Sequence, residues 1–207
     1  MTETKFNFFL KKEEQSNQLD ILYEIYRLKK VRKKLTSKLN SLKKALKSGI
    51  NVEIKYKFEA LKVVIKENDI QHKNLLAILD TRFNLFELSK NLKDYDLYIE
   101  NLEKERKKRL IDLETFEVTK GYYLQQILDT QESLKQLKLR ATDYYQELRN
   151  ELINLEDQRI RLTAEKIRNK IDSTEFSEKS KIIEKLKISV EEKLAFLKVK
   201  ILDYDFE

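Results

Sequence analysis

The sequence contains no cysteine and no proline, and only two glycines among its 207 residues. Without cysteine, the chain can form neither disulfides nor zinc–thiolate sites, and thiolate catalysis is excluded. Proline and glycine are the main residues of turns, so their scarcity predicts few tight loops and no strand–turn–strand signals. Charged residues make up 38% of the chain and hydrophobic residues 41%. This mixture is typical of coiled coils and long helices rather than of disordered chains.

The residues of familiar catalytic and cofactor sites are also missing. The single histidine, His72, falls on a predicted helical seam, so we interpret it as a residue that fixes helix register. One histidine supplies neither a zinc site nor the two Glu-x-x-His motifs of a four-helix di-iron site. Two isolated glycines cannot build a phosphate-binding loop. We therefore expect no enzyme activity, no cofactor and no metal.

Long apolar runs are absent as well. Nowhere do eighteen apolar residues follow one another, so no transmembrane helix is expected. Residues 1–10 lack the apolar core and the small-residue cleavage site of a secretory signal. Together with the missing cysteines, this predicts a cytoplasmic protein that meets membranes, if at all, at their surface.

Apolar residues recur at alternating steps of three and four, the spacing of one helix face. We call such a row of residues, through which a helix packs against a neighbour, the seam of that helix. A first helix is predicted from about Gln18 to Lys47, with Ser16 or Asn17 as its cap and Ser48-Gly49 as its end. Only Arg32 interrupts the apolar series of its seam. The other seam residues are Ile21, Ile25, Leu28, Leu35, Leu39, Leu42 and Leu46. The pattern predicts an all-α fold of elongated antiparallel helical hairpins, or a coiled-coil bundle, with long helices.

The chain divides into four predicted parts. These are an aromatic and basic segment (1–15), a basic first helix (16–49), a long helical hairpin region (50–170), and a last helix with an acidic tail (173–207). Within 50–170, a second helix begins near Val52, and two candidate breaks lie at 91–96 and 119–122. Asn68 joins His72 on the seam of this second helix. Asp172 or Thr174 is predicted to cap the last helix.

The first helix carries an unusual charge. Ten basic residues and no acidic residue lie between positions 27 and 47, and without these ten the net charge of the chain changes from +7 to −3. Besides Arg32, they are Arg27, Lys29, Lys30, Lys33, Lys34, Lys38, Lys43, Lys44 and Lys47. Like charges four residues apart destabilise a helix. We therefore expect an acidic counterpart opposite these side chains.

Three counterparts are compatible with this charge. The first is an acidic face of another helix, in the same bundle or in a neighbouring subunit. The second is an anionic membrane surface, into which the lysine-flanked Phe6, Phe8, Phe9 and Leu10 could insert shallowly. The third is nucleic acid, which is less favoured because no helix-turn-helix or zinc-finger pattern is present.

The leading functional hypothesis is a non-enzymatic coiled-coil structural or adaptor protein that acts through protein–protein assembly, as a homo-oligomer or as a subunit of a larger complex. The order of Phe6–Leu10, Arg27–Lys47 and Gly49 resembles the layout of ESCRT-III and phage-shock-protein-A-like membrane-remodelling proteins. That resemblance implies a peripheral membrane protein that polymerises on lipid. A second alternative is a stalk subunit of a rotary or secretion ATPase, because the first and last helices have similar predicted lengths.

Overall fold

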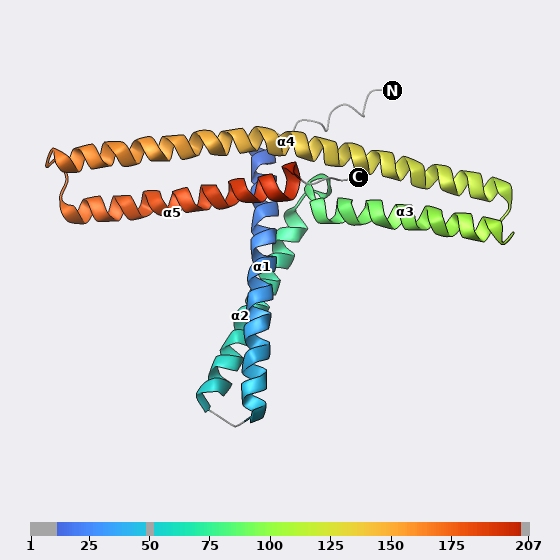
Figure 1. Ribbon diagram of the computed structural model, residues 1–207, viewed down its shortest axis with the longest axis horizontal. Helices are drawn as coiled ribbons and strands as arrows, with labels where there is room; N and C mark the ends of the chain where they lie inside the picture. The colour runs from blue at the N-terminus through green and yellow to red at the C-terminus, as the bar shows by residue number, and fades with distance from the viewer. Residues whose placement is uncertain (1–11, 49–51, 204–207) are drawn as a thin grey trace. The chain divides into compact units, whose positions relative to one another are not determined.

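A computed structural model describes residues 12–48 and 52–203 (Figure 1). The long helices are α1 (Lys12–Ser48), α2 (Val52–Ile78), α3 (Leu85–Lys107), α4 (Leu113–Ile167) and α5 (Ser173–Leu197). A short 3-10 helix, η1 (Thr81–Phe83), follows α2, and a π-helical turn, η2 (Lys198–Leu202), follows α5. The predicted all-α fold is confirmed. The chain forms two compact units, Met1–Phe83 (unit 1) and Asn84–Glu207 (unit 2).

Unit 1 is an antiparallel hairpin of α1 and α2 (Figure 1). Ile25 and Leu28 are buried, and the later seam leucines are half-buried. From Leu28 onward, the apolar seam residues are thus shielded as predicted. Before Leu28, the burial departs from the prediction, because Leu19, Leu22 and Tyr23 are buried whereas Ile21 is only half-buried. The helix begins at Lys12, earlier than predicted, and extends to Ser48, whereas Gly49, which was predicted to end it, lies outside the described residues. Ser16 and Asn17 consequently lie inside the helix and do not cap its start.

The base of the hairpin is closed by a side chain of α1. The backbone N–H of Asp80 donates to Oε1 of Gln18 over 2.8 Å, and Nε2 of Gln18 donates to the carbonyl of Ile78 over 3.5 Å. Gln18 thereby satisfies backbone groups at the C-terminal end of α2, which would otherwise lack partners. These bonds also set the register, with Gln18 opposite residues 78–80.

Unit 2 is organised along α4, whose 55 residues span about 80 Å. α3 runs antiparallel along the first half of α4 and α5 along the second half (Figure 1). Their registers place the start of α3 and the end of α5 beside the middle of α4. There, Leu134, Leu137 and Ala141 are at most 2% exposed. The core of unit 2 therefore surrounds the middle of α4.

The two turns of unit 2 have the same geometry. Arg109 and Asn169 both adopt the left-handed conformation, with φ of 59° and 53°. A six-residue backbone hydrogen bond of the Schellman type closes each turn, over 3.1 Å and 2.9 Å. The carboxylates of Asp112 and Asp172 then accept backbone N–H bonds at the starts of α4 and α5. Asp172 is thus the predicted cap, whereas the first turn was not predicted.

The candidate breaks at 91–96 and 119–122 are wrong, because α3 and α4 run through them without interruption. Residues 91–96 contain no proline or glycine, and Leu92 and Tyr95 keep the helical spacing. A Cβ at Gly121 would meet nothing within 4 Å, so this glycine only lowers helix propensity by about 1 kcal/mol. The long helices are interrupted instead between Ile78 and Leu85 and at 108–112.

Candidate functional site

The charged residues of the hairpin are sorted by their position relative to the seam. In an α-helix, the residue directly after a seam position lies on one flank of the seam, about 100° away from it. Beyond Leu28, these positions of α1 hold Lys29, Lys33, Thr36, Asn40, Lys43 and Lys47. The seam of α2 consists here of Ile54, Phe58, Leu61, Ile65, Asn68 and His72. The positions directly after them hold Lys55, Glu59, Lys62, Lys66, Asp69 and Lys73.

In an antiparallel pair, the positions that follow the seam lie on the same broad face of both helices. The contact between the helices agrees with this geometry, because Arg32 of α1 pairs with Asp69 on this face of α2. The pKa of His72 in α2 is lowered first by burial and then by Lys29 of α1. We call this surface the lysine face. It holds eight exposed lysines, namely Lys29, Lys33, Lys43, Lys47, Lys55, Lys62, Lys66 and Lys73.

The two carboxylates on the lysine face are already engaged. Asp69 accepts hydrogen bonds of 2.5 and 3.2 Å from Arg32, and this interaction lowers the pKa of Asp69. Glu59 lies 3.0 Å from Nζ of Lys62, which also lies 4.5 Å from the centroid of the Phe58 ring. Within residues 12–48 and 52–203, no carboxylate forms an ion pair with the following five lysines of the face. They are Lys33, Lys43, Lys47, Lys55 and Lys66.

The other broad face of the hairpin, which we call the opposite face, has a mixed composition. It consists of the residues directly before each seam position, namely Arg27, Val31, Lys34, Lys38, Ser41 and Ala45 of α1 and Glu53, Lys57, Ala60, Val64, Glu67 and Gln71 of α2. Arg27 lies 2.7 Å from Glu24, and Lys57 lies 2.5 Å from Glu53. The positive charge of the hairpin is therefore concentrated on the lysine face.

The structure divides the predicted basic residues among three surfaces. Lys29, Lys33, Lys43 and Lys47 lie on the lysine face, Arg27, Lys34 and Lys38 on the opposite face, and Lys30 and Lys44 on the outer edge of α1. The predicted insertion residues Phe6, Phe8, Phe9 and Leu10 lie outside the described residues. Of the acidic counterpart expected within the same bundle, α2 provides Asp69, which pairs with Arg32, but α2 also adds four lysines to the face.

The contribution of α2 was missed because its charges nearly balance. Five lysines and four acidic residues lie in Val52–Ile78, so the net charge of the segment gives no signal. The signal was the position of four of those lysines, each directly after a seam residue. Grouping the charged residues by the side of the seam on which they lie, rather than by segment, reveals these four lysines.

A polar layer crosses the seam beside the lysine face. Asn68 is only 7% exposed, and the Oδ1 atom of Asn68 and the Nε2 atom of His72 have no hydrogen-bond partner among the described residues. The charged groups around this layer are Lys29 and Arg32 of α1 and Asp69 of α2. Burial and the two cations together lower the pKa of His72. A polar layer of this kind fixes register at a cost in stability.

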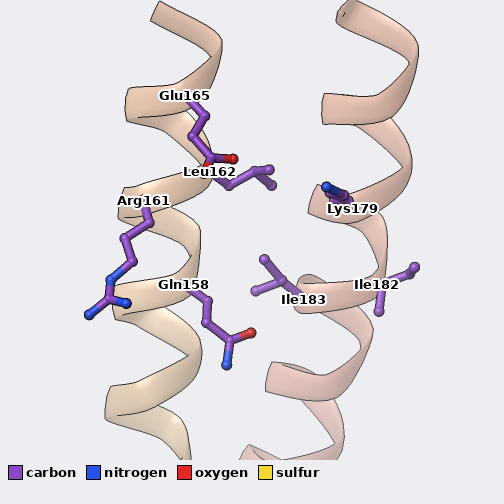
Figure 2. A pocket seen from close by; sticks show the side chains of 7 residues that line it. All are labelled: Gln158, Arg161, Leu162, Glu165, Lys179, Ile182 and Ile183. Atoms are coloured by element: carbon purple, nitrogen blue, oxygen red, sulfur yellow. The ribbon is translucent and has the colours of Figure 1, made fainter. Parts of the chain in front are cut away.

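Unit 2 contains an open groove between α4 and α5 (Figure 2). It is lined by Gln158, Arg161, Leu162, Glu165, Lys179, Ile182 and Ile183. Figure 2 shows Leu162 and Ile183 pointing into the space between the helices, whereas Arg161 and Ile182 point away from it. Lys179 pairs with Glu175 over 2.7 Å, which raises the pKa of Lys179. The groove is thus the edge of a helix–helix seam.

Comparisons with known proteins give no identification. No protein-family model matches the chain, and no curated protein or solved structure matches it significantly. Among the described residues, no helix combines the length and apolarity needed to cross a bilayer, and no group of histidine and carboxylate side chains is arranged to hold a metal ion.

Proposed function

We propose that the protein is a non-enzymatic helical adaptor whose α1–α2 hairpin docks onto an anionic surface. The observation that carries this proposal is the lysine face. Lys29–Lys33, Lys43–Lys47 and Lys62–Lys66 are like-charge pairs four residues apart, and each costs a few tenths of a kcal/mol in an isolated helix. An anionic surface against this face would attract the lysines and offset their mutual repulsion.

Two variants with the same change in charge test the proposal. The lysine-face variant carries Lys33→Glu, Lys47→Glu and Lys62→Glu. The opposite-face variant carries Lys34→Glu, Lys38→Glu and Lys57→Glu. Each variant changes two lysines of α1 and one lysine of α2 that has a glutamate partner in its own helix, at 3.0 Å for Lys62 and 2.5 Å for Lys57. The two variants therefore differ mainly in which face of the hairpin loses charge.

Binding is measured with three anionic probes: poly-L-glutamate, a short DNA duplex and vesicles containing phosphatidylserine. The wild-type chain is expected to bind at least one probe, with an affinity that falls as salt rises. The lysine-face variant is expected to lose at least about ten times more affinity than the opposite-face variant. Equal losses in both variants, or no binding to any probe, would contradict the proposal.

A second candidate function, self-assembly, is supported by a row of exposed isoleucines on α4. Ile153, Ile160 and Ile167 are 55%, 67% and 76% exposed. Their spacing of seven residues places them on one stripe of the helix, as at one heptad position of a coiled coil. This row is the feature of unit 2 that best supports the assembly role expected of an adaptor.

Light scattering across a range of concentrations tests self-assembly. Ile160→Glu is expected to weaken an oligomer of the full chain by at least about tenfold, because it places a charge in the centre of the row. Ile182→Glu is the matched control, since Ile182 is 58% exposed but lies on α5. A wild-type chain that stays monomeric at every concentration would exclude this candidate.

A further inference from the structure

The composition of the lysine face discriminates between kinds of anionic partner. Resting on the proposed docking function, we infer that the lysine face lies against the anionic headgroups of a phospholipid bilayer. Three features of the face carry this inference: the residues missing from it, the engagement of the nearby arginines, and the arrangement of its lysines in two rows.

The face lacks the residues by which proteins recognise proteins. Cores of protein interfaces are enriched in aromatic residues, methionine and arginine, and depleted in lysine. The twelve positions of the face hold eight lysines, two carboxylates, one threonine and one asparagine, without an aromatic or aliphatic residue. An acidic protein would therefore find charge but no apolar anchor on this surface.

The face is also poorly suited to nucleic acid. Arginine is the preferred residue for bidentate phosphate contacts, but Arg27 is paired with Glu24, and Arg32 with Asp69. No aromatic side chain occupies the face for base stacking. Two helices side by side are about 20 Å wide, which exceeds the roughly 12 Å major groove, so the hairpin cannot enter the groove to contact base edges.

A bilayer surface matches the remaining geometry. The lysines lie in two rows on two antiparallel helices whose axes are about 8–10 Å apart, and the row of α1 extends over about 27 Å from Lys29 to Lys47. Their flexible stems allow the ammonium groups to reach one plane. Near an anionic leaflet, each lysine strengthens binding about fivefold. Because no apolar residue lies on the face, the hairpin rests on the headgroups without inserting.

Sedimentation with vesicles, in about 0.15 M NaCl, tests the inference on the full chain. The vesicles contain phosphatidylcholine alone, or with about 30% phosphatidylserine. Wild-type protein is expected to sediment only with the phosphatidylserine vesicles. The lysine-face variant is expected to bind them at least about 100-fold more weakly, because three lysines are reversed, and the opposite-face variant within about fivefold of wild type.

A DNA duplex and poly-L-glutamate, matched to the vesicles in accessible anionic charge, complete the experiment. Both are expected to bind at least about tenfold more weakly than the phosphatidylserine vesicles. If either binds as tightly, with the same difference between the variants, the lipid assignment is wrong while the docking function stands. If no probe binds, both proposals fail.

Circular dichroism and thermal melting verify that the variants fold. A milder variant, with Lys33→Gln, Lys47→Gln and Lys62→Gln, keeps the test decisive if the glutamate substitutions disturb the hairpin. It is expected to bind phosphatidylserine vesicles at least about tenfold more weakly than wild type. Binding of a folded glutamine variant at the wild-type level would overturn the inference.

Discussion

The two units use the same helical building blocks but distribute charge in opposite ways. Unit 1 holds 19 lysines and arginines against 10 acidic residues, whereas unit 2 holds 24 against 26. In unit 2, opposite charges join neighbouring helices, as in Lys120–Glu103 at 2.8 Å and Lys187–Glu156 at 3.0 Å. In unit 1, Arg32–Asp69 is the one such cross-helix pair in the described residues. Among the described residues of unit 1, by contrast, five lysines of the lysine face form no ion pair with a carboxylate, namely Lys33, Lys43, Lys47, Lys55 and Lys66.

Unit 2 also buries its seam residues more completely than the outer part of the unit 1 hairpin does. Truncating one leucine in each unit tests this difference in packing. Leu137→Ala, in the buried middle of α4, is expected to cost about 2–5 kcal/mol of unfolding free energy. Leu39→Ala, on the half-buried seam of unit 1, is expected to cost about 1–2 kcal/mol. Urea denaturation measures both values, with exposed Leu139→Ala as a control expected within about 0.5 kcal/mol of wild type. Equal costs for Leu137 and Leu39 would remove the packing contrast.

Because the two turns of unit 2 have the same geometry, removing the capping aspartate of either turn is expected to lower the unfolding free energy by a similar amount. Asp112→Ala and Asp172→Ala are each expected to cost about 1 kcal/mol, because each removes a carboxylate that accepts backbone N–H bonds. Hydrogen bonds from Glu175 and Thr174 lower the pKa of Asp172. The stabilisation by Asp172 is therefore complete above about pH 4 and is lost as the pH falls through its lowered pKa. Denaturation at neutral and acidic pH checks both statements, and losses that differ by more than about 1 kcal/mol would contradict equivalent turns.

The left-handed residues at these turns predict a small gain in stability. An L-residue in this conformation costs roughly 1–2 kcal/mol, which glycine avoids and asparagine partly avoids. Arg109→Gly is therefore expected to raise the unfolding free energy by about 1 kcal/mol, and Asn169→Gly by less. Chemical denaturation measures the order of the two gains. A larger gain at Asn169 than at Arg109 would be inconsistent with this explanation.

The smallest expected change in stability comes from His72, in the polar layer that it forms with Asn68 in unit 1. His72 is the only histidine, and its pKa in the folded chain lies below its usual value near 6.5. The unfolded chain then binds the proton more readily, so the unfolding free energy decreases as the pH falls from about 6.5 to the folded pKa. Melting temperatures measured between about pH 7 and pH 5 should show this decrease, and His72→Gln should flatten it. A decrease of equal size in the variant would assign it to other groups.

The sequence predicted the features that depend on local periodicity. The leucine and isoleucine spacing located the seam of α2 and that of α1 from Ile25 onward, and Asp172 marked the start of α5. The turn at 108–112 was missed because Arg109, rather than glycine, takes the left-handed position. A detectable signal was present, since Ile-Asp with phenylalanine four residues after the aspartate occurs at 111–116 and again at 171–176.

The lysine face could not be predicted from the first helix alone. Its rows lie on two helices, and they share a face only because α1 and α2 are antiparallel with Arg32 opposite Asp69. The extent of burial was equally inaccessible from the pattern. Leu28 and Leu35 lie seven residues apart and occupy equivalent seam positions, but Leu28 is buried and Leu35 is half-buried, a difference set by tertiary neighbours rather than by spacing.

The unbroken length of α4 has a mechanical consequence for unit 2. Because α3 and α5 pack on different halves of a single helix, the angular phase of that helix determines their relative orientation. One residue inserted near Leu139 would rotate the second half by about 100° about the helix axis relative to the first half. Seven inserted residues would return it to within about 20° of its original phase while lengthening the helix by about 10 Å. The length of α4 therefore sets both the rotation and the separation of α3 and α5 along the helix axis.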